Sequence, residues 1–330
     1  MKAVITGGAG FLGRKLAEKI LARGALVGAS GREEAIEELL LFDRAPPAPP
    51  LAKDNRLRFV AGDIADPGVL REVVHRASSV FHFAAVVSAE AEADTDKGMS
   101  VNLDGTRALL DACRAQGTRP RLIFASSLAV YGGEMPDLVG DDMPLRPATS
   151  YGAQKAIGEL LVNDYSRKGF IDGRPLRFPT IIIRPGRPNR AASTFASSIF
   201  REPLAGRDAV CPVAPETKMA VLSPRRLVAA LEALHDMPAE RFGAGSLQLP
   251  AISVSVAEMI AALARAEARA AARIRFAPDP AIEKIVAGWP RALEATRARA
   301  LGIAADRDID EIVSSFITDD LPAQRALMEA

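Results

Sequence analysis

A glycine-rich turn near the amino terminus constrains the fold of this chain more than any other feature. An apolar run at residues 3–6 leads into Gly7, Gly10 and Gly13, and the apolar residues after it recur at helical spacing. Gly7 permits a tight turn, Gly10 permits close approach of a pyrophosphate, and Gly13 lets the helix pack against the strand. Amide groups at the helix start, where Phe11 and Leu12 lie, favour anionic phosphates. The order strand, turn, helix predicts a dinucleotide site, although the spacing alone also fits an ordinary glycine-rich turn.

Apolar runs typical of buried strands alternate with helical patterns along the first half of the chain. The expected strands are residues 3–6, 39–43, 57–61, 79–83, 122–126 and 180–184, and the expected helices are residues 11–22, 69–76, 98–116 and 151–168. Continuous Val, Ile, Leu and Phe runs suit parallel strands that are buried on both faces. The pattern predicts an α/β fold with a doubly wound parallel sheet (Rossmann), which binds ligands at the carboxyl ends of its strands.

The alternation weakens in the second half of the chain. Residues 24–34 and the proline-rich residues 45–50 are expected to be loops. After residue 184 the remaining helical patterns are residues 191–201, 224–234, 256–272 and 308–316. We therefore expect a dinucleotide-binding domain at 1–184 and a smaller, mainly helical substrate-binding part at 185–330. The pattern leaves open whether this second part returns strands or helices to the first.

Composition excludes several classes of function. The chain has 42 Lys and Arg against 41 Asp and Glu, so it gives no reason to expect a nucleic-acid or anionic membrane partner. The two cysteines, Cys113 and Cys211, and three isolated histidines have no metal-ligand spacing, and we expect no metal site. No export signal and no apolar run of membrane-spanning length is present. These observations predict a cytoplasmic protein.

Tyr151 and Lys155 carry the second strong signal. They are four residues apart at the start of a predicted helix and therefore share one face. The predicted strand 122–126 ends at Ser126, and Ser127 follows it, at the edge where this fold binds ligands. A tyrosine has a pKa of about 10, so a base near pH 7 needs its phenolate stabilised by roughly 3 units, or about 4 kcal/mol. The Lys155 ammonium and an oxidised nicotinamide both favour the phenolate, which predicts hydride transfer from an alcohol.

These motifs together resemble the extended short-chain dehydrogenase/reductase family, also called the NAD-dependent epimerase/dehydratase family. The resemblance implies that Ser127, Tyr151 and Lys155 are catalytic and that Ser126, Tyr151 and Lys155 lie beside the cofactor. It also implies cofactor contacts for a further set of positions, Asp63, Ile64, Ala84, Ala85, Asn102 and Pro185. Structural alternatives are a helix cap at Asp63, a helix-kinking hydrogen bond at Asn102 and a strand end at Pro185.

Asp43 bears on the choice of cofactor. It ends the predicted strand 39–43, where a carboxylate accepts hydrogen bonds from the adenosine ribose and repels a 2′-phosphate. It lies beyond the usual distance of about 20 residues from the glycine turn, because residues 24–34 are inserted. The charge favours NAD, whereas the neighbouring Arg44 suits the extra phosphate and keeps NADP as the less favoured alternative.

The substrate side departs from the nucleotide-sugar enzymes of the family. Residues 84–94, 184–193, 219–226 and 287–290 resemble instead the members that oxidise D-erythronate at C2 to 2-oxo-tetronate. Ala220 departs from that likeness, which implies a bulky aromatic there. A small hydroxy acid needs a cation for its carboxylate and polar partners for its hydroxyls. The candidate substrate residues are Ser88, Ser127, Arg187, Asn189, Ser193 and Arg225, and each arginine has a surface ion pair as its alternative.

Two other functions remain open. A nucleotide-sugar epimerase or dehydratase uses the same residues but keeps its NAD through the cycle. A non-catalytic NAD(P)-binding sensor shares the fold, but such proteins typically lose the tyrosine or the lysine. Helices at 98–116 and 151–168 resemble those that pack between subunits in the family, so we expect a homodimer that acts on a small molecule.

Overall fold

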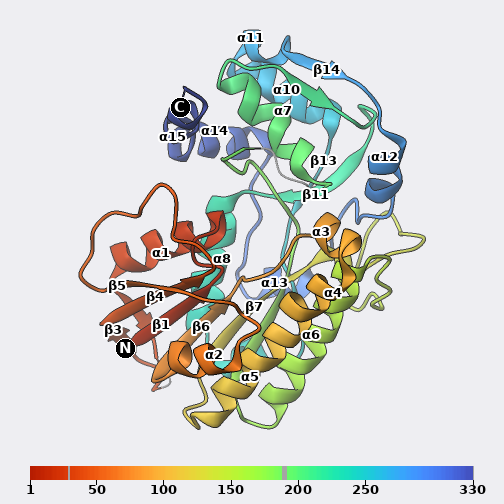
Figure 1. Ribbon diagram of the computed structural model, residues 1–330. Coiled ribbons are helices and arrows are strands. Elements are labelled where there is room, and N and C mark those ends of the chain that lie inside the picture. Colours follow the sequence, from red (N-terminus) through yellow and green to blue (C-terminus); the bar gives the residue numbers. More distant parts are fainter. Residues whose placement is uncertain (29, 188–191, 330) are drawn as a thin grey trace. The chain divides into compact units, whose positions relative to one another are not determined.

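The computed structural model describes residues 1–28, 30–187 and 192–329 and divides the chain into two compact units (Figure 1). Unit 1 comprises Met1–Val130, Thr149–Arg177 and Val228–Gln248. Unit 2 comprises Tyr131–Ala148, Phe178–Leu227 and Leu249–Ala330. Both units are assembled from separated stretches of the chain, and the functional division at residue 184 stays a prediction.

Unit 1 is built on a seven-stranded sheet in the order β12-β8-β7-β6-β1-β4-β5. Its strands are β1 (Lys2–Thr6), β4 (Glu38–Asp43), β5 (Leu57–Ala61), β6 (Ala77–His82), β7 (Arg121–Ser127), β8 (Asp172–Phe178) and β12 (Leu247–Gln248). β1 pairs in parallel with β4 and β6, β6 pairs with β7, β4 with β5, and β8 with β12. The strand order reverses beside β1, which confirms the predicted doubly wound fold.

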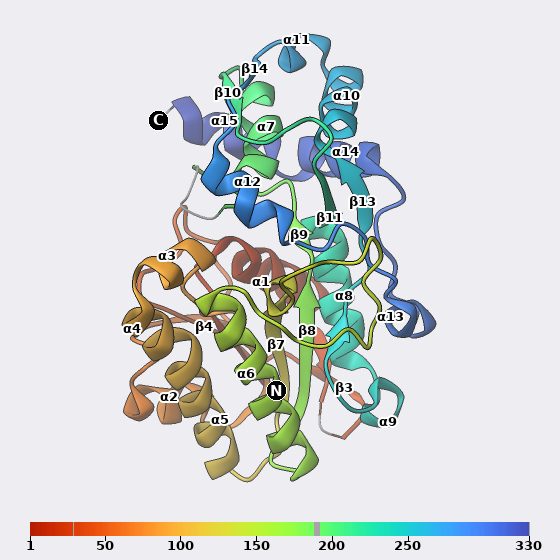
Figure 2. The same cartoon turned by 90° about the vertical axis from the view of Figure 1, so that its right-hand side faces the viewer.

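Helices cover both faces of this sheet. They are α1 (Phe11–Arg23) and the unit 1 part of α8 (Pro224–Asp236) on one face, and α2 (Pro67–Val74), α5 (Gly105–Ala115) and α6 (Ser150–Arg167) on the other (Figures 1 and 2). Because strand side chains alternate between faces, Val4, Phe42 and Phe124 join the core under α2, α5 and α6. On the α8 side, the His235 ring stacks on Phe81 with a centroid distance of 5.0 Å.

Unit 1 also contains shorter elements. These are β2 (Ala25–Val27), β3 (Glu33–Ala35), α3 (Ser88–Ala93), α4 (Thr95–Gly98), a π-helical turn (Met99–Asp104), a 3₁₀ turn (Leu128–Val130) and α9 (Ala239–Phe242). The expectation of a loop at residues 24–34 was wrong, because β2 and β3 pair there as antiparallel strands. The expected helix 98–116 is instead a π-helical turn followed by α5.

Unit 2 combines two small sheets with helices. Its strands are β9 (Thr180–Ile181), β10 (Ala209–Cys211), β11 (Lys218–Leu222), β13 (Ile252–Ser255) and β14 (Ile274–Phe276). Its helices are α7 (Thr194–Leu204), α10 (Val256–Ala266), α11 (Ala268–Ala271), α12 (Pro280–Ala287), α13 (Thr296–Ala300), α14 (Ile309–Asp319) and α15 (Leu321–Glu329). Apolar side chains from α7, α10 and α14 form one buried core with those of β11.

The expected strand 180–184 was wrong in extent and place. Only Thr180–Ile181 is extended, as β9, and it pairs with β11 in unit 2. The strand that follows β7 in the large sheet is β8, whose sequence DGRPLRF is not an apolar run. Its two arginines, Arg174 and Arg177, are buried against carboxylates. Paired charges therefore replaced the apolar pattern on which the prediction relied.

Among the described residues, no helix is long and apolar enough to cross a membrane. Within the same part of the chain, no group of three or more His, Cys, Asp or Glu side chains is arranged to hold a metal ion. Cys113 and Cys211 are both buried free thiols, and burial raises the pKa of each.

Gly158 brings α6 close to β7, and its replacement tests that packing. A Cβ at this position would lie 2.6 Å from the Phe124 ring. Glycine to alanine in an exposed helix stabilises by about 1 kcal/mol, whereas overpacking a core costs about 1–3 kcal/mol. We expect Gly158→Ala to lower the free energy of unfolding, measured by urea denaturation. Arg167→Ala, at the exposed end of α6, should change it by less than about 0.5 kcal/mol; a Gly158→Ala protein as stable as the wild type would contradict the packing.

Candidate active site

The glycine turn follows β1 and is packed too tightly for side chains. A Cβ on Gly7, whose φ is 68°, would lie 2.7 Å from the Ala84 nitrogen. A Cβ on Gly13 would lie 2.5 Å from the Gly7 oxygen, and one on Gly10 3.2 Å from the same atom. Gly10 is the N-cap of α1 and carries no side chain to occupy the first-turn amides. The turn therefore offers bare backbone at a helix start, as a pyrophosphate requires.

Two acidic residues lie at the carboxyl edge of the sheet near this turn. Asp43 ends β4, and its Oδ2 accepts a hydrogen bond from the Ala9 amide at 3.0 Å. The carboxylate is thus fixed against the glycine turn, and its contact with the ribose of a dinucleotide stays a prediction. Asp63 is exposed after β5, beside the buried Ile64. The helix-cap alternative for Asp63 was wrong, because Asp66 caps α2.

Tyr151 and Lys155 lie together in the first turns of α6. Thr149 caps this helix, and its Oγ1 accepts a hydrogen bond from the Gly152 amide at 3.1 Å. Lys155 is 2% exposed, and its Nζ lies 4.8 Å from the centroid of the Phe124 ring and 5.6 Å from that of Tyr151. Burial lowers the pKa of Lys155 to about 8, and this change is partly opposed by the charge of Glu159.

The two serines at the end of β7 have different surroundings. Ser126 is 2% exposed, and its Oγ donates to Glu159 Oε1 at 2.5 Å. Ser127 is half-buried, and its Oγ accepts a hydrogen bond from the Ala129 amide at 3.1 Å. Both side chains belong to unit 1, as do Tyr151 and Lys155.

Asn102 joins α6 to the segment after β6. It is buried in the π-helical turn, where its Oδ1 accepts from the Val86 amide at 2.9 Å. Its Nδ2 donates to the Val86 carbonyl at 3.2 Å and to Gln154 Oε1 at 2.8 Å. Because Ala84 and Ala85 directly precede Val86, Asn102 fixes the path of these residues. The helix distortion at Asn102 is real, and its cofactor contact stays a prediction.

The candidate substrate residues come from both units, and two of them have local partners. Ser88 begins α3 in unit 1, whereas Arg187 is exposed in unit 2 and Asn189 lies outside the described residues. Ser193 Oγ accepts a hydrogen bond from Arg184 Nη2 at 3.1 Å. Arg225 Nη2 lies 2.6 Å from Asp319 Oδ1, the ion pair that was its structural alternative.

Pro185 precedes a loop that the carboxyl-terminal helix holds. The buried side chain of Gln324, on α15, accepts from the Gly186 amide at 2.6 Å and donates to the Gly186 carbonyl at 3.2 Å. The side-chain amide of Gln324 thus makes two hydrogen bonds to Gly186, and both residues belong to unit 2. The predicted cofactor contact of Pro185 stays untested by these bonds.

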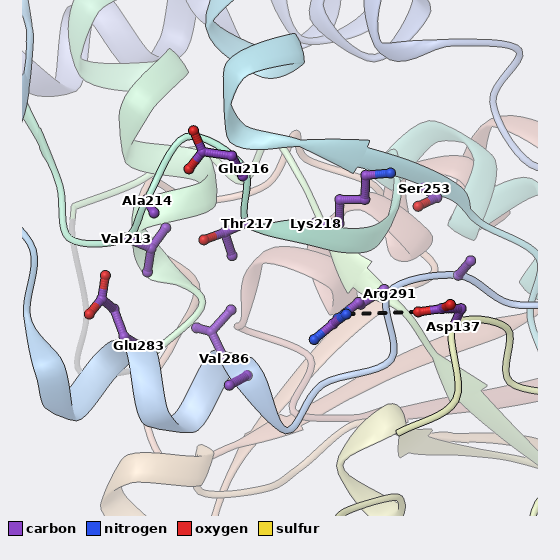
Figure 3. A pocket seen from close by; sticks show the side chains of 12 residues that line it. Asp137, Val213, Ala214, Glu216, Thr217, Lys218, Ser253, Glu283, Val286 and Arg291 are labelled. Atoms are coloured by element: carbon purple, nitrogen blue, oxygen red, sulfur yellow. Dashed lines mark ion pairs between the residues drawn. The ribbon is translucent and has the colours of Figure 1, made fainter. Parts of the chain in front are cut away.

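Unit 2 contains a cavity of about 800 Å³ that the sequence did not reveal (Figure 3). Lys218 and Arg291 bring positive charge to its lining, and Asp137, Glu216 and Glu283 bring negative charge. Arg291 Nη1 lies 3.8 Å from Asp137 Oδ1. The positions come from four distant stretches of unit 2, and no motif joins them in the sequence.

Comparison with known proteins defines the class. Residues 3–226 match the NAD dependent epimerase/dehydratase family, to which the chain belongs. The chain is 52% identical to the D-erythronate dehydrogenase of Cupriavidus necator over 97% of its own length and 98% of that protein. It is 42% identical to the D-erythronate dehydrogenase of Haemophilus influenzae over 97% of its length and all of that protein.

Solved structures show the same fold. The nucleoside-diphosphate-sugar epimerase from Agrobacterium tumefaciens is 42% identical, with a TM-score of 0.91 over 98% of this chain and 95% of that one. L-threonine 3-dehydrogenase from Trypanosoma brucei is 24% identical, with a TM-score of 0.85 over 98% of both chains. The second likeness concerns the fold alone.

The pKa of Lys155 has a measurable consequence for stability. In the unfolded chain this lysine holds its proton up to about pH 10.4, whereas in the folded protein it loses the proton near pH 8. Between these values the unfolded state binds more protons, so the contribution of Lys155 to the free energy of unfolding rises with pH. We expect the difference in free energy of unfolding between wild type and Lys155→Met, measured by urea denaturation, to change in favour of wild type from pH 8 to 10. A pH-independent difference would contradict the buried environment.

Proposed function

We propose that the protein oxidises D-erythronate at C2 to 2-oxo-tetronate with NAD. The observation that carries this proposal is the likeness to two D-erythronate dehydrogenases over nearly the whole chain. The paired Tyr151 and Lys155 on α6 supply the chemistry that such a reaction needs, and this favours an enzyme over a non-catalytic sensor.

The glycine turn and the carboxylate of Asp43 fit NAD. Residues Gly7, Gly10, Phe11, Leu12 and Gly13 hold the pyrophosphate, and Asp43 binds the adenosine ribose. The other members of the predicted cofactor site are Asp63, Ile64, Ala84, Ala85, Asn102, Ser126 and Pro185. NAD, when bound, accepts the hydride that leaves C2 of the substrate.

The proposed proton transfer depends on Tyr151, Ser127 and Lys155. Tyr151, as a phenolate, removes the proton of the C2 hydroxyl while the hydride leaves the same carbon, and a carbonyl forms. Ser127 donates a hydrogen bond to the substrate oxygen and holds it toward the tyrosine. The Lys155 ammonium stabilises the phenolate and binds the nicotinamide ribose. Burial of this ammonium strengthens its effect, because a low dielectric weakens screening.

The remaining expectations extend this proposal. Residues 1–184 carry the cofactor and catalytic residues, and residues 185–330 mostly bind substrate. Ser88, Arg187, Asn189, Ser193 and Arg225 are candidate substrate contacts, although the ion pair of Arg225 with Asp319 weakens its claim. The protein acts in the cytoplasm as a homodimer; the exposed Ile157 and Leu160 on α6 support an apolar subunit contact there.

Turnover of four-carbon sugar acids tests the proposed reaction. D-erythronate, L-erythronate, D-threonate and L-threonate are each mixed with NAD, and NADH is followed by its absorbance at saturating cofactor. We expect the highest kcat/KM with D-erythronate. Absence of NADH with every acid, together with conversion of a nucleotide sugar without net NADH, would overturn the proposal and favour an epimerase.

Tyr151→Phe removes only the phenolic oxygen. General base catalysis contributes roughly 10²–10⁴-fold, so we expect kcat with D-erythronate to fall by at least about 10²-fold. Calorimetric titration should still show NAD binding, because the glycine turn and Asp43 are intact. Full activity in this variant would remove the tyrosine from its proposed role.

Asp43→Asn tests the preference for NAD. Loss of the negative charge removes the repulsion of a 2′-phosphate, so kcat/KM with NADP relative to NAD should rise about tenfold, equal to about 1.4 kcal/mol. Glu37→Gln is the control, since its side chain is 84% exposed just before β4. The cofactor ratio of the control should equal that of wild type. An Asp43→Asn enzyme with an unchanged ratio would exclude the ribose contact.

A further inference from the structure

One buried carboxylate joins three elements of unit 1 next to the catalytic pair. Glu159 is 1% exposed on α6, one helical turn after Lys155. Its Oε2 lies 2.7 Å from Arg177 Nη2, and its Oε1 accepts a hydrogen bond from Ser126 Oγ at 2.5 Å. Arg177 Nε lies 3.0 and 3.1 Å from the two oxygens. Because Ser126 is on β7 and Arg177 on β8, a single side chain ties both strands to α6.

The Glu159 carboxylate also acts on Lys155 through its charge. The ammonium lies over the rings of Phe124 on β7 and Tyr151 on α6, and the side chain is only 2% exposed, so little water reaches it. His82 on β6 stays neutral, because burial and the charge of Lys155 lower its pKa to about 3. Arg177 on β8 is itself a cation. The charge of Glu159 raises the pKa of Lys155 against the effect of burial.

We propose that Glu159 is a positioning residue of the oxidation, which keeps Lys155 charged and holds the end of β7 against α6. This inference rests on the proposed function, in which the Lys155 ammonium stabilises the Tyr151 phenolate. Glu159 itself touches neither substrate nor cofactor in this scheme. It acts through Lys155 by charge and through Ser126, the neighbour of Ser127, by a hydrogen bond.

A purely structural ion pair makes a different prediction. Loss of a buried carboxylate–guanidinium pair destabilises the fold wherever it lies. Loss of charge beside Lys155 also changes the proton affinity of that amine, because a nearby anion favours the ammonium. Titration of Lys155 therefore separates the two roles, whatever the change in stability.

Glu159→Gln keeps the shape of the side chain and removes its charge. The titration is followed by NMR of protein labelled with ¹³C at lysine Cε, and the signal is assigned by its loss in Lys155→Met. We expect the midpoint of Lys155 to move about one pH unit lower, corresponding to a tenfold change in proton affinity. The alkaline limb of kcat with D-erythronate should move in the same direction, because the ammonium is lost at lower pH.

Glu202→Gln is the matched control. Glu202 is a buried glutamate whose Oε1 lies 2.7 Å from Arg201 Nη2, so the variant loses the same kind of ion pair in unit 2. It should leave the Lys155 midpoint unchanged. An unmoved midpoint in Glu159→Gln, or an equal movement in both variants, would overturn the inference.

Arg177→Gln gives a second test if Glu159→Gln does not fold. Removing this cation leaves the negative charge of Glu159 without its counter-ion, so the titration midpoint of Lys155 should move to higher pH. No movement of that midpoint would also overturn the inference. The NMR titration needs no substrate and therefore decides whether Glu159 keeps Lys155 charged even if D-erythronate is not oxidised. Conversely, NADH formation with D-erythronate and an unmoved midpoint would leave the proposed function standing and remove Glu159 from it.

Discussion

The burial of the Lys155 ammonium beside Tyr151 is the interaction on which the proposed chemistry depends. A charge in an apolar environment is costly unless nearby groups stabilise it. Here the cost appears as a pKa of about 8 for Lys155. The same low dielectric strengthens the attraction between ammonium and phenolate on which the proposed mechanism relies.

Packing of α6 against β7 creates that environment. Gly158 allows the helix to approach the Phe124 ring, and Lys155 lies over the same ring from the preceding turn. Glu159 then binds both Ser126 and Arg177. Glycine, lysine and glutamate within five residues therefore determine the distance, the burial and the charge at this edge of the sheet.

The parallel sheet explains why distant motifs converge. The glycine turn, Asp43 and Ser127 follow or end three different strands, and parallel strands bring their carboxyl ends to one edge. Ala84 approaches Gly7 so closely that a Cβ on the glycine would clash with its backbone nitrogen. This spacing reserves the turn for backbone and leaves no glycine side chain over the start of α1.

The sequence predicted the parts of the fold whose signal is local. Glycine spacing, buried apolar runs and the Tyr151–Lys155 interval each follow from neighbouring residues, and they placed β1, β4, β5, β7, α1 and α6 to within a few residues. β8 was missed because Arg174 and Arg177 make it look polar, and their partners are distant in sequence. Glu159 was missed for a related reason, since a glutamate in a helix normally faces water. The available signal was the presence of Arg177 on β8 and of Glu159 on α6, two opposite charges that can pair.

A crystal structure with NAD and D-erythronate tests the central claim most directly. The account predicts the Tyr151 hydroxyl within about 3 Å of the C2 oxygen, with the Lys155 amine on the nicotinamide ribose and C2 facing the ring carbon that accepts the hydride. A complex in which the tyrosine turns away from the substrate, or in which Lys155 binds neither the ribose nor the phenol, would contradict it.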